Sequence, residues 1–136
     1  MKYKILEFPH FIESRGTLTP FEFDSDFPFV VKRVYTVTGT EGATRGAHAH
    51  LKESEVFVVV SGSVTAIIDD GKGSEQIILD EPYKGLYVAT MCWHEFVNFS
   101  EDAVLLCFSS THYLPGETNY ITDRDEFYNL IKAQSV

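Results

Sequence analysis

The chain has 136 residues, a length that suits a single hydrophobic core, and we expect one domain over residues 1–136. Hydrophobic residues make up 44% of the chain, which argues against a disordered protein. The formal net charge of −9 argues against a nucleic-acid polymer as a partner, because a phosphate backbone requires a basic surface.

Neither the start of the chain nor its apolar runs predict a secreted or membrane protein. Residues 1–11 lack the long apolar core of a signal peptide, and the runs at 56–60 and 103–108 are far too short to span a bilayer. The two cysteines, Cys92 and Cys107, form no CxxC pair and do not indicate a disulfide scaffold. We therefore expect a cytoplasmic protein without a membrane partner.

Most of the chain reads as short strands separated by turn residues. Many of these runs are rich in β-branched and aromatic side chains, and their spacing is typical of an all-β sandwich or barrel. Several runs are apolar at successive positions, which predicts strands covered on both faces. The predicted strands are residues 16–23, 29–39, 55–62, 63–73, 75–80, 85–90, 94–100 and 103–110.

The hydrophobic period changes at the C-terminus, where residues 122–134 predict a short helix. Thr122, followed three residues later by Asp125, has the pattern of a capping box at a helix N-terminus. Phe127, Leu130 and Ile131 then follow at helical spacing. We expect this helix to pack on the outside of the β body.

The stretch "RGAHAH" (45–50) places two histidines two residues apart. If the segment is extended, His48 and His50 point to one face and Ala49 to the other, because side chains alternate along a strand. Two imidazoles on one face indicate a metal site, an acid/base pair, or a coincidence of two core histidines.

The spacing around this pair resembles the first motif of the cupin superfamily at every defined position: Gly42, His48, His50, Glu55 and Gly62. A second cupin motif is partial, because its central proline and glycine are absent; the residues that match it are Gly85, His94 and Asn98. The resemblance implies a cupin barrel, a double-stranded β-helix or jelly roll, whose strands present side chains to one cavity. In cupins such a set of histidines and a glutamate commonly holds a divalent metal, although many cupins keep the fold without the ion.

Within the cupins, the chain resembles the dTDP-sugar 3,4-ketoisomerases, a WxcM-like family. The segments that carry the resemblance are "ESRGTLTPFE" (13–22), "FVVKRVYTV" (29–37), "RGAHAH" (45–50), "GLYV" and "WHEFVNFS" (within 85–100), and "YITDRDEF" (120–127). The resemblance implies a homodimer that moves the carbonyl of a dTDP-linked 4-keto-6-deoxyhexose, dTDP-4-keto-6-deoxyglucose, from C4 to C3 without a metal or other cofactor. The chain departs from the family at Glu55, where members often carry Gln, and at Leu51, where they carry a basic residue.

Moving the carbonyl from C4 to C3 requires a base for the C3 proton, which is acidic because it lies next to the ketone, and an acid for O4. Proton transfers at O3 and C4 complete the exchange through an enediol, so the site needs groups with pKa values near neutrality. Histidine meets this need with little tuning. We assign His50 as the carbon acid/base and His48 as its partner at the sugar oxygens.

Arginines are the candidates for binding the diphosphate, because a protein of charge −9 must concentrate positive charge locally. Arg15, Arg33 and Arg45 are these candidates, and each is also compatible with an ordinary strand or surface position. Arg45 is a candidate for neutralising the developing oxyanion charge as well. Tyr35 shares strand parity with Arg33, so one face presents both to the cavity. His94 lines the pocket or, by the resemblance, sets the C4 configuration together with Arg15. This combination resembles the members that give the galacto-configured 3-keto product.

Tyrosines are further candidates, because their rings can stack on the thymine of the nucleotide. The three candidates are Tyr87, Tyr113 and Tyr120. Aromatic residues in β-proteins are more often part of the core, so both interpretations stay open.

Two other functions are compatible with the sequence. The first is a metal-dependent cupin enzyme, such as an oxygenase or isomerase, with the ligands His48, His50, Glu55 and His94. The second is a module that binds a nucleotide sugar without catalysis. A related sugar epimerase that acts at C3 and C5 matches the motifs less well.

Overall fold

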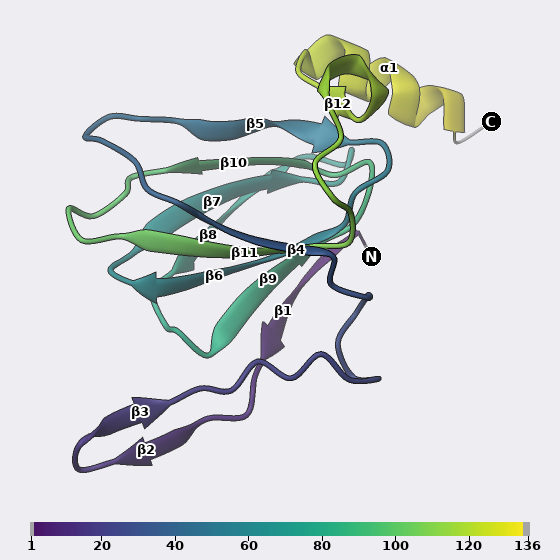
Figure 1. The fold of residues 1–136 in the computed structure, drawn as a ribbon. Coiled ribbons are helices and arrows are strands. Elements are labelled where there is room, and N and C mark those ends of the chain that lie inside the picture. Colours follow the sequence, from purple (N-terminus) through teal and green to yellow (C-terminus); the bar gives the residue numbers. More distant parts are fainter. Residues whose placement is uncertain (1, 135–136) are drawn as a thin grey trace.

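The computed structural model describes residues 2–134, which form two five-stranded sheets that enclose a common core (Figure 1). Sheet 1 contains, in spatial order, β1 (Tyr3–Glu7), β9 (Lys84–Val88), β6 (Glu55–Ser61), β11 (Val104–Ser109) and β4 (Arg33–Val37). Sheet 2 contains β12 (Tyr120–Ile121), β5 (Arg45–His50), β10 (Trp93–Val97), β7 (Val64–Asp69) and β8 (Ser74–Leu79). All neighbouring strands of the two sheets run antiparallel, which confirms the predicted all-β barrel.

Sheet 1 is covered on both faces, as its apolar runs predicted. On β6, Phe57 and Val59 point into the barrel core, whereas Val56 and Val58 belong to a second core on the outer face. Aromatic side chains from the first thirty residues cover that outer face: Phe8, Phe21, Phe27 and Phe29. An uninterrupted apolar strand is therefore explained by two separate cores, one on each side of the sheet.

The predicted strand at residues 16–23 is wrong beyond residue 18. β3 (Gly16–Leu18) pairs with β2 (Phe11–Glu13) in a hairpin that projects away from the barrel (Figure 1). Residues 19–32 contain no strand, and the strand predicted at 29–39 is confined to β4. The prolines of this segment cannot donate to a sheet ladder, and its phenylalanines are instead used to cover sheet 1.

The C-terminal helix, α1 (Arg124–Gln134), begins two residues later than predicted and follows a short 3-10 helix, η1 (Gly116–Thr118). The predicted cap, Thr122, is wrong, because the Asp123 carboxylate accepts the hydrogen bond from the Glu126 N–H, at 2.9 Å. Phe127 is fully buried and packs beside Trp93, so the helix covers the outer face of sheet 2, as expected. The helices within residues 2–134 lack the length and the hydrophobicity of a membrane span.

Candidate active site

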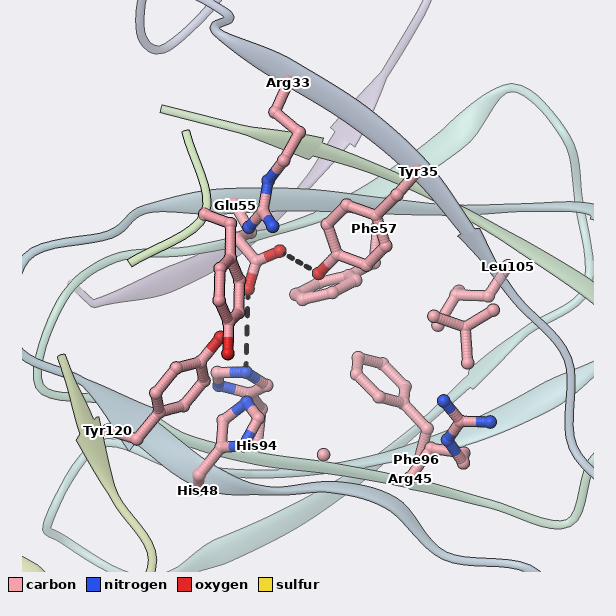
Figure 2. A pocket seen from close by; sticks show the side chains of 13 residues that line it. Arg33, Tyr35, Arg45, His48, Glu55, Phe57, His94, Phe96, Leu105 and Tyr120 are labelled. Carbon is pink, nitrogen blue, oxygen red and sulfur yellow. Dashed lines mark hydrogen bonds and ion pairs between the residues drawn. The ribbon is translucent and has the colours of Figure 1, made fainter. Parts of the chain in front are cut away.

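A cavity of about 210 Å³ lies between the two sheets, with a lining from β4, β5, β6, β10, β11 and the C-terminal segment (Figure 2). Its polar lining includes six residues predicted for the site or its metal: Arg33, Tyr35, Arg45, His48, Glu55 and His94. Tyr113 and Tyr120 complete the polar surface. The apolar lining consists of Val37, Phe57, Phe96 and Leu105. The fold therefore gathers chemistry-bearing side chains from distant parts of the chain around one space.

A β-bulge in β5 places Arg45 and His48 in the same cavity. These two residues are three apart, so a regular strand would point them to opposite faces. Gly46 and Ala47 both have positive φ angles, of 78° and 64°, and the pairing with β10 shifts register there. A Cβ on residue 46 would lie 3.1 Å from the His94 carbonyl oxygen, so glycine suits both the angle and the close approach.

Three histidine rings cluster at the cavity, and two of them, His48 and His94, line it. The ring centroids of His48 and His50 are 4.6 Å apart, those of His48 and His94 are 4.8 Å apart, and those of His50 and His94 are 5.1 Å apart. His48 is half-buried and lines the cavity, whereas only 3% of His50 and 2% of His94 is exposed. The parity prediction for His48 and His50 is confirmed, and the structure adds that they lie at different depths.

The surroundings keep the three imidazoles neutral. Burial lowers the pKa of His48 to about 4, and burial together with His48 lowers the pKa of His94 to about 3. Burial and the neighbouring histidines also hold the pKa of His50 well below its usual range. Because the Nδ1 of His94 lies 3.1 Å from the Cys92 carbonyl oxygen, an acceptor, Nδ1 carries the proton and Nε2 keeps its lone pair.

Glu55 lies at the inner end of the histidine cluster and is 1% exposed. Its Oε2 accepts a hydrogen bond from the Tyr35 hydroxyl, and its Oε1 lies 3.2 Å from the Nδ1 of His50 and 3.9 Å from the Nε2 of His94. Burial, and then the charge of Glu53, raises the pKa of Glu55 to about 8. Glu55 therefore binds a proton far more readily than an ordinary carboxylate.

A second buried carboxylate, Glu53, was not predicted from the sequence. Its side chain is fully buried and accepts hydrogen bonds from Arg33 at 2.7 Å, from Asn119 at 2.9 Å, and from Ser109. Arg33 is therefore held against Glu53 at the edge of the cavity, with its guanidinium 4.8 Å from the centre of the Tyr35 ring. No motif points to Glu53, because its partners come from segments far away in the sequence.

Besides His50, which lies behind His48, two residues that the sequence singled out do not line the cavity of this chain. Arg15 lies at the turn of the β2–β3 hairpin, where its side chain is 88% exposed and pairs with Glu13 at 3.2 Å. Tyr87 points to the outer face of sheet 1 and packs near Phe29, which is the core position that the sequence left open as the alternative to stacking on the base. β9 presents Leu86 and Val88, the neighbours of Tyr87, to the barrel core instead.

The donor atoms of the site fit a divalent cation in part. One ring nitrogen from each of His48, His50 and His94 lies within 4.8 Å of the others, and a second group contains His50, Glu53 and Glu55. The Nε2 of His94 and the Oε1 of Glu55 are buried without a hydrogen-bond partner. Imidazole and carboxylate donors suit zinc, iron, manganese or nickel, so these residues would hold such an ion if one binds.

Two antiparallel sheets around a cavity with three histidines define a protein of the cupin class. The family model described as "FdtA: WxcM-like, C-terminal" matches residues 1–132, and the chain belongs to this family. This membership confirms the resemblance drawn from the sequence motifs.

Relatives in this family are 3,4-ketoisomerases of TDP-linked sugars. A TDP-4-oxo-6-deoxy-alpha-D-glucose-3,4-oxoisomerase of Aneurinibacillus thermoaerophilus is 42% identical over 132 residues, which cover 96% of this chain and 94% of the relative. A double mutant of QdtA from Thermoanaerobacterium thermosaccharolyticum, solved in complex with TDP, matches with a TM-score of 0.90 and 35% identity over 98% of this chain and 96% of QdtA. WlaRA of Campylobacter jejuni, a TDP-fucose-3,4-ketoisomerase, matches with a TM-score of 0.85 and 36% identity over 96% of each chain.

Proposed function

We propose that this protein is a 3,4-ketoisomerase that converts dTDP-4-keto-6-deoxyglucose to its 3-keto isomer, using its own side chains as acids and bases. The observation that carries the proposal is the cluster of three neutral imidazoles at one cavity, two of which line it. In support, QdtA, 32% identical over 98% of this chain, has been solved as a mutant in complex with TDP-4-keto-6-deoxyglucose. A neutral histidine can take a proton from carbon and return it, which is what the reaction requires.

In this proposal His48 is the carbon acid/base. Its lone pair takes the proton from C3, the C–H electrons form the C3=C4 bond, and the C4=O4 pair moves onto O4 to give an enediolate. O4 then gains a proton, O3 loses one, and the imidazolium of His48 returns its proton to C4, so no proton is consumed. We choose His48 because it lines the cavity, whereas His50 lies behind it, next to Glu55. The roles of His48 and His50 are therefore the reverse of those expected from the sequence, where His50 was the carbon acid/base.

His50, Glu55 and Tyr35 form the inner part of the proposed proton path. His50 lies between the His48 ring and the Glu55 carboxyl, and Glu55 also accepts the Tyr35 hydroxyl. Because burial raises the pKa of Glu55 to about 8, its carboxyl holds a proton near neutral pH. The group can therefore exchange protons with His50 while the sugar oxygens gain and lose theirs.

We place the nucleotide toward Arg45. Its guanidinium is held by a hydrogen bond to the Thr38 carbonyl at 2.9 Å, and its side chain is exposed, so it can meet a diphosphate from solvent. Arg33 is partly neutralised by Glu53 and contributes positive potential at the sugar end. Tyr113 lies near Arg33 and is a candidate for stacking on the base.

We propose the galacto configuration at C4 of the product. Relatives differ on this point: WlaRA is a TDP-fucose 3,4-ketoisomerase, and WlaRB, also of Campylobacter jejuni, is a TDP-quinovose 3,4-ketoisomerase. The QdtA double mutant gains an arginine and a histidine, which are the residue types at positions 15 and 94 of this chain. Proton NMR of the product distinguishes the two C4 epimers through the coupling between H4 and H5.

We also propose a homodimer in which a second copy of the chain covers the β2–β3 hairpin. Phe11, Ile12 and Leu18 of this hairpin are 57%, 73% and 59% exposed, an apolar surface that favours a protein partner. Arg15 at the hairpin turn would then contact the second copy and not the cavity of its own chain. Light scattering on the purified protein should give twice the mass of the chain, and a stable monomer would contradict this arrangement.

Both cysteines are free and buried, in keeping with the cytoplasmic location that we expect.

The test of the proposed function is a proton NMR assay of the purified protein with dTDP-4-keto-6-deoxyglucose, with and without EDTA. We expect the 3-keto isomer in both samples, with deuterium at the sugar carbons when the reaction runs in D₂O. Product only without chelator would favour the metal-dependent alternative, which the unpartnered Glu55 and His94 atoms support. Tight binding of the nucleotide sugar without solvent exchange would point to a binding module.

A further inference from the structure

The enediolate of the proposed reaction needs a hydrogen-bond donor at O4, and several side chains beside the histidines already donate to other partners. The Tyr35 hydroxyl donates to Glu55, and the Arg33 guanidinium donates to Glu53. The N–H of His94 is directed at the Cys92 carbonyl oxygen, with Nδ1 at 3.1 Å, and His48 is the base of the proposed reaction. A developing oxyanion in a buried site requires a donor that is already in place, because water is largely excluded there.

Tyr120 is placed to supply this donor. Its strand, β12, pairs with β5 so that Tyr120 lies opposite His50. Its ring meets those of His48 and His50 at 4.9 Å in each case, at steep angles of 69° and 75°. In Figure 2 the Tyr120 side chain extends from β12 into the cavity, with its hydroxyl at the inner end.

The position of Tyr120 is fixed by contacts that do not use its hydroxyl. The preceding residue, Asn119, accepts the Leu51 N–H on its carbonyl at 2.6 Å and the Lys52 N–H on its side chain at 3.0 Å. The Asn119 amide also donates to Glu53 at 2.9 Å. The backbone of Tyr120 is therefore tied to the turn after β5, and its ring is held by the histidines. Burial and the nearby carboxylates raise the pKa of Tyr120, so the hydroxyl keeps its proton.

We propose that Tyr120 is a further catalytic residue, whose hydroxyl donates a hydrogen bond to O4 of the sugar as the enediolate forms. The C3–H bond breaks toward the base, the C3=C4 bond forms, and the electron pair of the C4=O4 bond stays on O4, where the tyrosine stabilises it. The hydroxyl donates without losing its proton. This inference rests on the proposed 3,4-ketoisomerase function and adds the residue that stabilises its intermediate.

The experiment compares Tyr120→Phe with the wild type in the NMR assay, and uses Tyr87→Phe as the matched control. Tyr87 lies on the outer face of sheet 1, so loss of its hydroxyl should leave kcat and KM unchanged. Removing a single oxyanion donor typically lowers kcat about 100-fold or more. For Tyr120→Phe we expect a loss of about 100-fold in kcat, KM within about two-fold, and an equal slowing of deuterium uptake at C3. Titration with TDP counts the folded sites, so a folding defect cannot imitate a loss of kcat.

Three results would overturn the inference. If Tyr120→Phe keeps kcat within about three-fold of the wild type, the hydroxyl is not needed, since a loss of one oxyanion donor costs far more. If only Tyr120→Ala weakens TDP binding while Tyr120→Phe is normal, the ring stacks on the base and the hydroxyl plays no part. If the wild type itself does not isomerise the sugar, the proposed function fails and the inference fails with it.

Discussion

Two carboxylates buried in different parts of the barrel have opposite surroundings. Asp69, under helix α1, is fully buried and accepts hydrogen bonds from the N–H groups of Gly71 and Gly73, from the Tyr128 hydroxyl and from Arg124. Glu55, in the cavity, is equally buried but accepts one hydrogen bond, from Tyr35, and its other oxygen, near His50, has no hydrogen-bond partner.

The pKa values follow from this difference. Burial alone would raise the pKa of Asp69, but the hydrogen bonds from Tyr128, Gly71 and Gly73, together with Arg124, outweigh it and lower the pKa. At Glu55, burial and the charge of Glu53 prevail over the hydrogen bond from Tyr35 and raise the pKa to about 8. A buried carboxylate whose oxygens accept several hydrogen bonds stabilises the fold, whereas one with an oxygen that accepts none can take part in proton transfer.

The largest expected effect is the loss of kcat when His48, in the cavity, is replaced. Replacing His48 by Asn removes the proposed base, and general acid–base catalysis typically contributes 10²–10⁴-fold to a rate. We therefore expect about a 1,000-fold loss of kcat for His48→Asn, with a melting temperature close to that of the wild type. NMR turnover and thermal unfolding measure the two quantities. Full activity in this variant would exclude His48 as the carbon acid/base.

Asp69→Asn should give the opposite result, a loss of stability with kcat retained. The amide cannot accept as strongly from two N–H groups and an arginine, so we expect the free energy of unfolding to fall by about 2–3 kcal/mol. The lowered folded pKa means that this stabilisation is present above the unfolded pKa and disappears as the pH falls through the folded value. Denaturation at several pH values should show a weaker acid dependence in the variant. A loss of kcat without a loss of stability would remove the contrast with Glu55.

Glu55→Gln should stabilise the protein at alkaline pH. The folded pKa of about 8 lies above the unfolded value of 4.5, so the wild type loses stability as the pH rises between these values. Glutamine keeps the shape of the protonated carboxyl and cannot ionise. We expect a gain of about 1–3 kcal/mol at pH 8 and little change at pH 5, measured by urea denaturation. An unchanged stability at both pH values would mean that Glu55 is ionised without cost.

The smallest effect concerns the pH profile of the wild type. Because burial lowers the pKa of His48 to about 4, the base stays unprotonated across the neutral range. We expect kcat/KM to be flat from pH 7, where Glu55 still holds its proton, down to about pH 5 and to fall below that. A decline that starts near pH 6.5, the ordinary histidine value, would show that the working imidazole is more exposed than His48 is in this structure.

Local periodicity in the sequence predicts part of the fold and part of the candidate site. Alternation along a strand puts His48 and His50 on one face, and the mixture of β-branched and aromatic residues predicts the all-β barrel. Helical spacing places Phe127 on the buried side of α1. Motif spacing identified Glu55 and His94 as cavity residues. These features depend on residues close together in the chain, so the sequence reveals them.

Contacts between distant segments decided the local geometry of the site, the burial of its side chains and their hydrogen-bond partners. The bulge at Gly46 and Ala47, which aims Arg45 into the cavity, depends on pairing with β10. The burial of His48 and His50 depends on the segments that cover each ring. Glu53 can accept hydrogen bonds from Arg33 and Asn119 only after β4 and the C-terminal segment have folded beside it. Spacing and alternation were enough for the sequence to determine the barrel, the helix and the set of candidate side chains. Their depth, their hydrogen-bond partners and their proton affinities were decided by tertiary structure alone, because burial and pairing depend on neighbours that the chain brings together only on folding.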